Sequence, residues 1–153
     1  MGIRVSNTGI SVAEGNVIEV QGPVMVINGE KTIVSPTVTI TGTSTAPPPV
    51  TMSLATLCEG ANDTTGRKGI RTVALPVKVV GRVVAIDGEG TLLDLDNGAG
   101  GPVVRLKLPQ PMQVALKLNQ WVSVSGICSV ANGASGIGGI VLVKQPSDVT
   151  VIL

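Results

Sequence analysis

The side chains that usually perform catalysis are scarce in this sequence. It contains no His, and its Asp, Glu and Lys residues fall in expected turns or at solvent-facing positions of expected strands. General acid–base catalysis normally uses His or a carboxyl group with a tuned pKa, and a nucleophilic Ser or Cys needs an adjacent base. The sequence therefore predicts a protein that is not an enzyme, with no catalytic residue and no cofactor.

One aromatic residue and three basic residues are the candidates for contact with a ligand. Trp121 is the only aromatic side chain, and Arg82, Arg105 and Lys107 fall on expected strands. Proteins that bind single-stranded nucleic acid combine a basic groove with aromatic side chains on which bases stack. Trp121 shares the strand parity of Ser123, which favours an outward position, whereas a lone Trp at a strand start commonly caps a core.

The charge of the chain argues against nucleic acid as a partner. Eleven basic and ten acidic residues give a net charge of +1, and the basic residues do not cluster. Affinity for nucleic acid depends strongly on neutralisation of phosphates by clustered Lys and Arg. We therefore predict that nucleic acid is an unlikely partner.

No apolar run approaches the roughly 18 residues needed to span a bilayer, so no membrane span is expected.

Acidic residues around two neighbouring turns are the candidates for a metal site. Asp87, Asp94 and Asp96 offer carboxylate oxygens of the kind that Ca²⁺ binds. Turns also use Asp and Asn side chains to bond to their own backbone, and the spacing here matches no calcium loop. The interpretation is turn chemistry, and no metal is predicted.

The two cysteines leave their chemistry open. Cys58 and Cys128 cannot complete a zinc site without His, because such a site needs about four ligands. A disulfide would close a long loop and stabilise the chain in an oxidising compartment. Against a disulfide, Cys128 has the strand parity of Val122 and Val124, which is typical of a small buried residue.

Strands are expected along most of the chain. Val, Ile and Thr are abundant, and Gly and Pro supply turns. The expected strands are 3–5, 17–27, 31–34, 37–41, 77–87, 91–95, 103–108, 121–130, 140–143 and 149–153. Gly81 favours a bulge or a sharp coil that would let its strand serve two sheets. Residues 57–71 are expected to form a loop, and residues 110–120 at most one helical turn.

The two halves of the chain resemble each other. NVIEVQGPVMVING at residues 16–29 aligns without a gap with QWVSVSGICSVANG at residues 120–133, which places Gly22 on Gly126. SPTVTI aligns with QPSDVTVI, and GIRV aligns with VVRL. A match in fixed order indicates duplication. We predict a partial β unit at 1–57, a loop or linker at 58–76 and a complete unit at 77–153. The segment GTSTAPPP at 42–49 is expected to be a stiff, Pro-rich linker.

The strand order of the second unit is that of a five-stranded OB-fold barrel. GRV at 81–83, DNG at 96–98, VSVSG at 122–126 and DV at 148–149 resemble motifs of OB-fold modules found in tandem in bacterial exported and cell-surface proteins. The resemblance covers residues 77–153 well and residues 2–41 in part. It implies an all-β chain of two OB-fold-like barrel units, the first incomplete, and an extracellular or cell-surface location. It implies no catalytic residues.

The incompleteness of the first unit supports a functional prediction. The second unit begins with two strands, 77–87 and 91–95, that the first unit lacks, so the apolar face Ile18, Val20, Val24 and Val26 is left uncovered. Either the sequence is a truncated piece of a longer chain, or another subunit completes this unit by adding strands. We predict that a neighbouring copy adds a strand there, giving a homo-oligomer or polymer: an extracellular, self-assembling subunit of a fibre or ring. The alternative is a ligand-binding OB-fold module, for single-stranded nucleic acid or glycan, of a larger exported protein.

Overall fold

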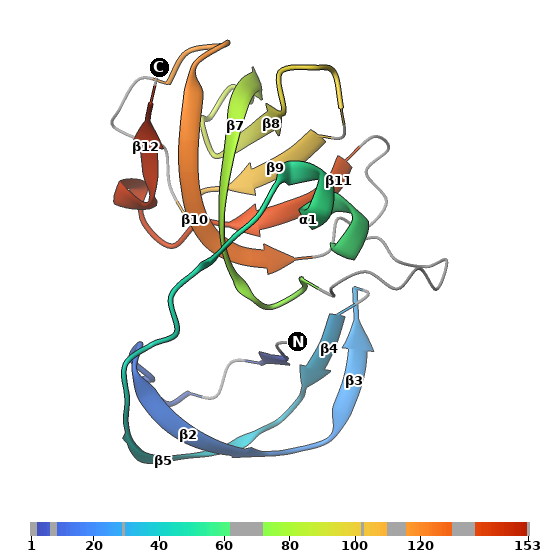
Figure 1. Cartoon of the computed structure of the whole chain (residues 1–153). Helices are drawn as coiled ribbons and strands as arrows, with labels where there is room; N and C mark the ends of the chain where they lie inside the picture. Colours follow the sequence, from blue (N-terminus) through green and yellow to red (C-terminus); the bar gives the residue numbers. More distant parts are fainter. Residues whose placement is uncertain are drawn as a thin grey trace. The chain divides into compact units, whose positions relative to one another are not determined.

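The chain folds into two compact units, Gly2–Pro48 and Pro49–Leu153, in a computed structural model (Figure 1). The structure describes residues 3–6, 9–28, 30–61, 72–101, 103–109, 116–129 and 137–152. The predicted boundary at residue 57 differs from this division, because the segment after Pro48 packs on the second unit. None of the helices in these described ranges is long and apolar enough to cross a membrane.

The second unit is built on a barrel of five strands. They are β7 (Pro76–Ile86), β8 (Leu92–Asp96), β9 (Val103–Lys107), β10 (Trp121–Ser129) and β11 (Ile137–Leu142). Pairing runs in the order β7-β8-β9-β11-β10, and β10 pairs with β7 to close the barrel. Strands β9 and β11 are parallel, and the other neighbours are antiparallel. The predicted five-stranded OB-fold barrel is confirmed.

Alternating aliphatic residues fill the interior of the barrel. Val79, Leu95, Val122 and Val124 are completely buried, and Cys128 is 1% exposed. Side chains of successive strand residues point to opposite faces, so these positions share one parity and their neighbours face outward. The predicted inward orientation of Val122, Val124 and Cys128 is confirmed.

Strand β7 serves two sides of the barrel. It pairs with β10 over Pro76–Arg82 and with β8 over Arg82–Ile86. The sequence predicts a bulge or sharp coil at Gly81 that would let the strand serve two sheets. The strand does serve two sides, and the irregularity in register lies between Val83 and Ala85 rather than at Gly81. Gly81 instead allows close packing: a Cβ there would lie 2.9 Å from the Cδ1 of Leu54.

Helix α1 (Leu54–Ala61) corrects the prediction of a loop that begins at residue 57. Ser53 caps its start, because the Ser53 Oγ accepts a hydrogen bond from the Thr56 N–H at 3.1 Å. Leu54 and Leu57 lie on one helical face and are buried in the barrel core. The helix contacts β7, β9, β10 and β11. The remainder of the predicted loop, 62–71, lies outside the described residues, as do residues 110–115 of the predicted helical turn.

Short elements extend the barrel at its margins. Strand β6 (Val50–Thr51) runs parallel to the start of β7. After a 3-10 turn, η1 (Pro146–Asp148), strand β12 (Val149–Val151) pairs with the first part of β10, while β11 pairs with the last part. Strand β10 therefore pairs with β12 and then with β11 along one edge, and with β7 along its other edge.

In its described residues, the first unit has five strands in two small sheets. They are β1 (Arg4–Val5), β2 (Asn16–Gln21), β3 (Val24–Ile27), β4 (Glu30–Ile33) and β5 (Thr37–Thr43). One sheet has the order β1-β4-β3, with β1 parallel to β4, and the other pairs β2 with β5. Residues 44–49 connect β5 to β6.

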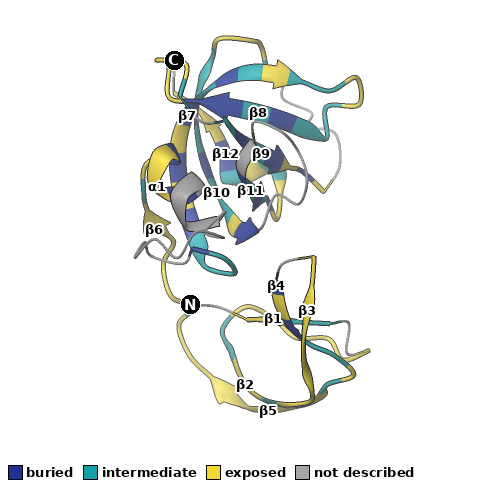
Figure 2. Cartoon of the chain, turned by 90° about the vertical axis from the view of Figure 1, so that its right-hand side faces the viewer, coloured by how far each residue is buried: buried dark blue, intermediate teal, exposed yellow. Residues whose placement is uncertain are grey.

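Most described residues of the first unit are exposed or only partly buried (Figure 2). Within its described residues, Val38 is the buried large hydrophobic side chain, whereas Ile18, Val24 and Val26 are 37%, 57% and 70% exposed. The apolar face expected on this unit is therefore present and uncovered by the rest of the unit.

Candidate ligand-binding face of the barrel

Four barrel strands bring polar side chains together on their outer surface. Trp121 at the start of β10 lies opposite Arg82 of β7, and Arg82 lies opposite Asp96 of β8. One pair further along β8, Asp94 lies opposite Arg105 of β9. We refer to these five residues as the polar strip. Three of the four candidate binding residues identified from the sequence therefore belong to one surface.

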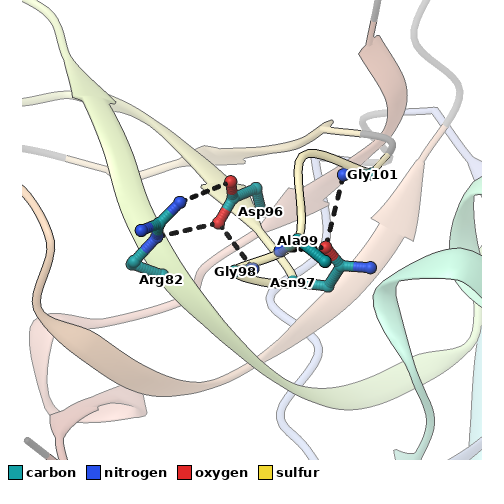
Figure 3. A network of polar contacts seen from close by, with 6 residues as sticks. All are labelled: Arg82, Asp96, Asn97, Gly98, Ala99 and Gly101. Atoms are coloured by element: carbon teal, nitrogen blue, oxygen red, sulfur yellow. Dashed lines mark hydrogen bonds and ion pairs between the residues drawn. The ribbon is translucent and has the colours of Figure 1, made fainter.

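Arg82 and Asp96 form the most enclosed ion pair of the strip (Figure 3). The Nε of Arg82 donates to the Oδ1 of Asp96 at 3.2 Å, and Nη2 donates to Oδ2 at 3.0 Å. The side chain of Asp96 is 8% exposed and that of Arg82 is 32% exposed. The hydrogen bonds from Arg82 and from the Gly98 N–H outweigh burial and lower the pKa of Asp96. The carboxylate in turn raises the pKa of Arg82.

The turn after β8 is fixed by its own side chains. Besides the bond from Gly98 to Asp96, the Oδ1 of Asn97 accepts hydrogen bonds from the backbone N–H groups of Ala99 and Gly101 (Figure 3). Gly98 has a φ of +83°, a conformation that favours glycine. Side-chain to backbone hydrogen bonds therefore hold this turn at one end of the polar strip.

Trp121 packs against this turn. A Cβ on Gly98 would lie 3.0 Å from the Cζ2 of Trp121, so the edge of the indole rests on bare glycine backbone. Trp121 itself is half-buried. The indole packs on this turn and is not a member of the hydrophobic core. Gly98 was not a candidate site residue, and the DNG sequence indicated only a turn.

Arg105 and Asp94 repeat the paired arrangement on the neighbouring strands. The Nε and Nη2 of Arg105 donate to the two carboxylate oxygens of Asp94 at 2.7 and 2.8 Å. Asp94 raises the pKa of Arg105 through these bonds. Lys107, the fourth candidate residue, is exposed on β9 opposite Leu92. The guanidinium groups are thus oriented by carboxylates, and Lys107 adds a cation at the edge of the strip.

The candidate metal ligands are engaged in separate interactions. Asp87 accepts hydrogen bonds from the Thr91 hydroxyl and the Leu92 N–H, both at 2.9 Å. The bond from Leu92 is the largest cause of a lowered pKa at Asp87. Asp94 and Asp96 each bind an arginine. In the part of the chain that the structure describes, no three potential ligands form a metal-binding group.

Cys128 faces the barrel interior, away from the polar strip. Its Sγ lies 3.3 Å from the Oγ1 of Thr72, to which the thiol donates a hydrogen bond, and both residues are buried. The side chain of Cys58 lies outside the described residues. Cys128 therefore serves as a small core residue, as its strand parity indicated.

The polar strip coincides in part with the ligand face of OB-folds, since Asp94, Asp96 and Arg105 lie on β8 and β9. Such barrels bind oligonucleotides and oligosaccharides on their second and third strands and on the loop between the first two strands. Here these elements are β8, β9 and residues 87–91. The strip offers an indole for stacking, planar guanidinium donors and carboxylate acceptors. This set of groups is suited to holding an extended polar ligand rather than to transferring protons.

Comparisons with known proteins identify no family for the chain. No protein-family model and no curated protein matches it. Among solved structures, the telomere capping protein Ten1 of Saccharomyces pombe matches 67% of this chain and 80% of its own, at 13% identity and a TM-score of 0.45. A chain of the S. pombe Stn1–Ten1 complex matches 70% of this chain and 79% of its own, at 14% identity and the same TM-score.

Several sequence-based predictions need correction. The prediction of an extracellular, self-assembling fibre or ring subunit is corrected by these neighbours, one of which is a telomere capping protein. The predicted extracellular or cell-surface location is wrong for the same reason. The statement that nucleic acid is an unlikely partner conflicts with these neighbours as well. The resemblance to bacterial exported modules holds for the OB-fold barrel and no further.

Proposed function

We propose that the C-terminal barrel is a non-enzymatic module that binds single-stranded nucleic acid across its polar strip. The strongest support for this binding function is the arrangement of Trp121, Arg82 and Asp96 on three adjacent strands. There a half-exposed indole lies beside a guanidinium group that is held by a carboxylate. An unpaired base stacks on an aromatic ring of this kind whatever its identity, because every base has a π face. The site is accordingly expected to tolerate many sequences.

Two exposed lysines extend the proposed path of the ligand. Lys107 lies on β9, and Lys78 lies on β7 with the same outward parity as Arg82. Both ammonium groups are suited to contact phosphates on either side of a stacked base. Arg82 and Arg105 contribute less charge, because each is paired with an aspartate, but they keep donors in fixed directions.

The balanced charge sets the expected strength of binding. With a net charge of +1, few phosphates are neutralised, so the dissociation constant should be on the order of 10⁻⁵ M near physiological salt. Stacking contributes about 1–3 kcal/mol per base, so loss of the indole should weaken binding by about 5- to 150-fold.

Fluorescence anisotropy with a labelled oligodeoxythymidylate of about 15 nucleotides tests the proposal. The full chain, Trp121→Ala and Trp121→Phe should be compared, with Leu118→Ala as a control because Leu118 is 57% exposed on the same unit. We expect weakening for Trp121→Ala, partial retention for Trp121→Phe and no change for the control. Equal affinity of all four proteins would contradict the stacking role, and absence of measurable binding at low salt would contradict the function.

A neutral oligosaccharide is the second candidate ligand. The alternation of guanidinium and carboxylate groups along the strip favours it, since sugar hydroxyls both donate and accept hydrogen bonds. Salt separates the two candidates: nucleic-acid binding should fall steeply between about 50 and 200 mM salt, whereas binding of a neutral glycan should not.

The organisation of the chain is also part of the proposal. The alignment of the two halves supports a tandem of one partial and one complete OB-fold unit, joined by the Pro-rich residues 44–49. Only the complete unit carries the polar strip, so the ligand is assigned to that unit.

A further inference from the structure

The strand pairings of the first unit repeat those of one half of the barrel. In the barrel, β10 pairs first with β12 and then with β11, and β11 runs parallel to β9. In the first unit, β2 pairs with β5, β3 pairs with β4, and β4 runs parallel to β1. Strands β2 and β3 follow each other as the two halves of β10 do. The first unit therefore contains counterparts of β9–β12.

The register of the two halves agrees residue by residue with the sequence alignment. Aligning Gly22 with Gly126 places Val20 on Val124 and Val24 on Cys128. Val20 pairs with Val38 as Val124 pairs with Val149, and Val24 pairs with Ile33 as Cys128 pairs with Val141. Arg4 pairs with Thr32 as Arg105 pairs with Ile140, which is the alignment of GIRV with VVRL.

The aligned glycines also occupy the same environment. A Cβ on Gly22 would lie 2.8 Å from the Cγ2 of Ile33 and 2.9 Å from the carbonyl oxygen of Val34. A Cβ on Gly126 would lie 2.6 Å from both the Cγ1 of Val141 and the carbonyl oxygen of Leu142. In each half the glycine lets one strand cross close over its partner.

The two halves differ in what covers them. Ile3, Ile18 and Val24 are 45%, 37% and 57% exposed, whereas their counterparts Val104, Val122 and Cys128 are 0%, 0% and 1% exposed. In the barrel, β7 pairs with the second edge of β10, and β8 pairs with the second edge of β9. Among the described residues, β2 is paired only with β5 and β1 only with β4. The exposed face is thus the face that a hairpin like β7–β8 would cover.

We infer that the first unit is a docking site for a β-hairpin with the pattern of β7–β8. The hairpin takes the place that β7 and β8 have in the barrel: its first strand pairs antiparallel with β2 and its second with β1. Its inward residues are aliphatic, as in β7 and β8. It also carries a carboxylate facing Arg4, because Asp94 on β8 holds the counterpart Arg105. In its absence Arg4 binds Glu30, with the Arg4 side chain 46% exposed.

A second copy of this chain is a poor occupant for structural reasons. Its β7–β8 hairpin is already paired on both sides within its own barrel, β7 with β10 and β8 with β9. Its first unit offers only counterparts of β9–β12, which are the strands that the docking site already contains. A partner with its own hairpin avoids opening a finished barrel.

A synthetic peptide with the sequence of residues 76–97 is the probe, because it has the required pattern. It should bind the full chain at a ratio of 1:1 by isothermal titration calorimetry. Ile18→Asp should weaken this binding by at least about tenfold, because it places a charge in the covered face. The matched control is Val17→Asp: Val17 is 44% exposed, adjacent on β2 and of the opposite parity, so binding should persist. Both residues are exposed before docking, so both variants should fold.

Hydrogen exchange locates the docked peptide. We expect new protection in β1 and β2 on addition of the peptide, without loss of protection in β9 and β10. Protection changes in the barrel would show that the peptide displaces its own β7–β8 hairpin and would overturn the inference. Equal binding by the Ile18→Asp and Val17→Asp variants, or no binding to the parent chain, would also overturn it. A dimer of the chain alone in sedimentation velocity, dissociated by Ile18→Asp, would assign the face to a second copy instead.

Discussion

Arg82 and Asp96 face each other across the β7–β8 ladder, and one guanidinium group binds both oxygens of one carboxylate. The same carboxylate accepts the N–H of Gly98, and the indole of Trp121 rests on that glycine. The ion pair thus connects the strand that carries the arginine, the turn after β8 and the single aromatic residue. Changes at this pair should affect both the stability of the barrel and the geometry of the proposed binding face.

The stability of the barrel should fall in acid, partly through Asp96. Its pKa is lowered in the folded state, so its stabilising effect is complete above the unfolded pKa of about 4 and is lost as the pH falls below that value. Asp96→Asn should therefore lower the free energy of unfolding at pH 7 and make its decline below pH 4 shallower. Urea titrations at several pH values, followed by the fluorescence of Trp121, measure both effects.

A double-mutant cycle separates the charge pair from other effects at Asp96. Arg82→Gln and the double variant should be titrated with Asp96→Asn, and the two changes should be non-additive because the residues are in direct contact. Additive losses at pH 7 would show that the two side chains act independently.

Loss of the Leu57 side chain should destabilise the barrel by about 2–5 kcal/mol, as is usual for a buried leucine. Leu57 is completely buried and belongs to the core although α1 precedes the first barrel strand. Leu57→Ala tests this in denaturant titrations, with the exposed Leu118→Ala as the matched control. An effect no larger than that of the control would mean that α1 is not part of the folded barrel.

Gly126→Ala should destabilise the barrel by about 1–3 kcal/mol through overpacking. The new methyl group would lie 2.6 Å from the backbone oxygen of Leu142, which cannot move without disturbing the β10–β11 pairing. Gly88→Ala is the control, because a Cβ on Gly88 meets nothing within 4 Å. Thermal unfolding of the two variants should separate clearly, and equal melting temperatures would contradict the close crossing.

Lys107→Gln should make binding of single-stranded DNA less dependent on salt. If Lys107 neutralises one phosphate, the slope of log affinity against log salt should fall by about 0.7. Lys31→Gln is the control, since Lys31 is exposed and belongs to the first unit, which does not carry the polar strip. An unchanged slope for Lys107→Gln would place the phosphate path elsewhere on the barrel.

The sequence alone was sufficient to predict the strands of the barrel. Alternation of aliphatic and polar residues assigns the inward parity of Val122 and Val124, because a one-residue shift would turn every apolar side chain to solvent. The sequence also predicts a duplication, since glycines and turns recur in fixed order. The helix at 54–61 was missed because eight residues with two leucines and a serine cap are a weak local signal. That helix is stabilised by packing on the barrel rather than by its own propensity.

The sequence identified Trp121, Arg82, Arg105 and Lys107 as separate candidates and Asp87, Asp94 and Asp96 as possible metal ligands. Only the tertiary structure decided that Asp94 and Asp96 bind the two arginines and that Gly98 supports the indole. The physical reason is that residue spacing fixes the face on which a strand residue lies, whereas the pairing of strands fixes its neighbours. Those neighbours are distant in sequence, and the choice among them depends on the closure of the whole barrel.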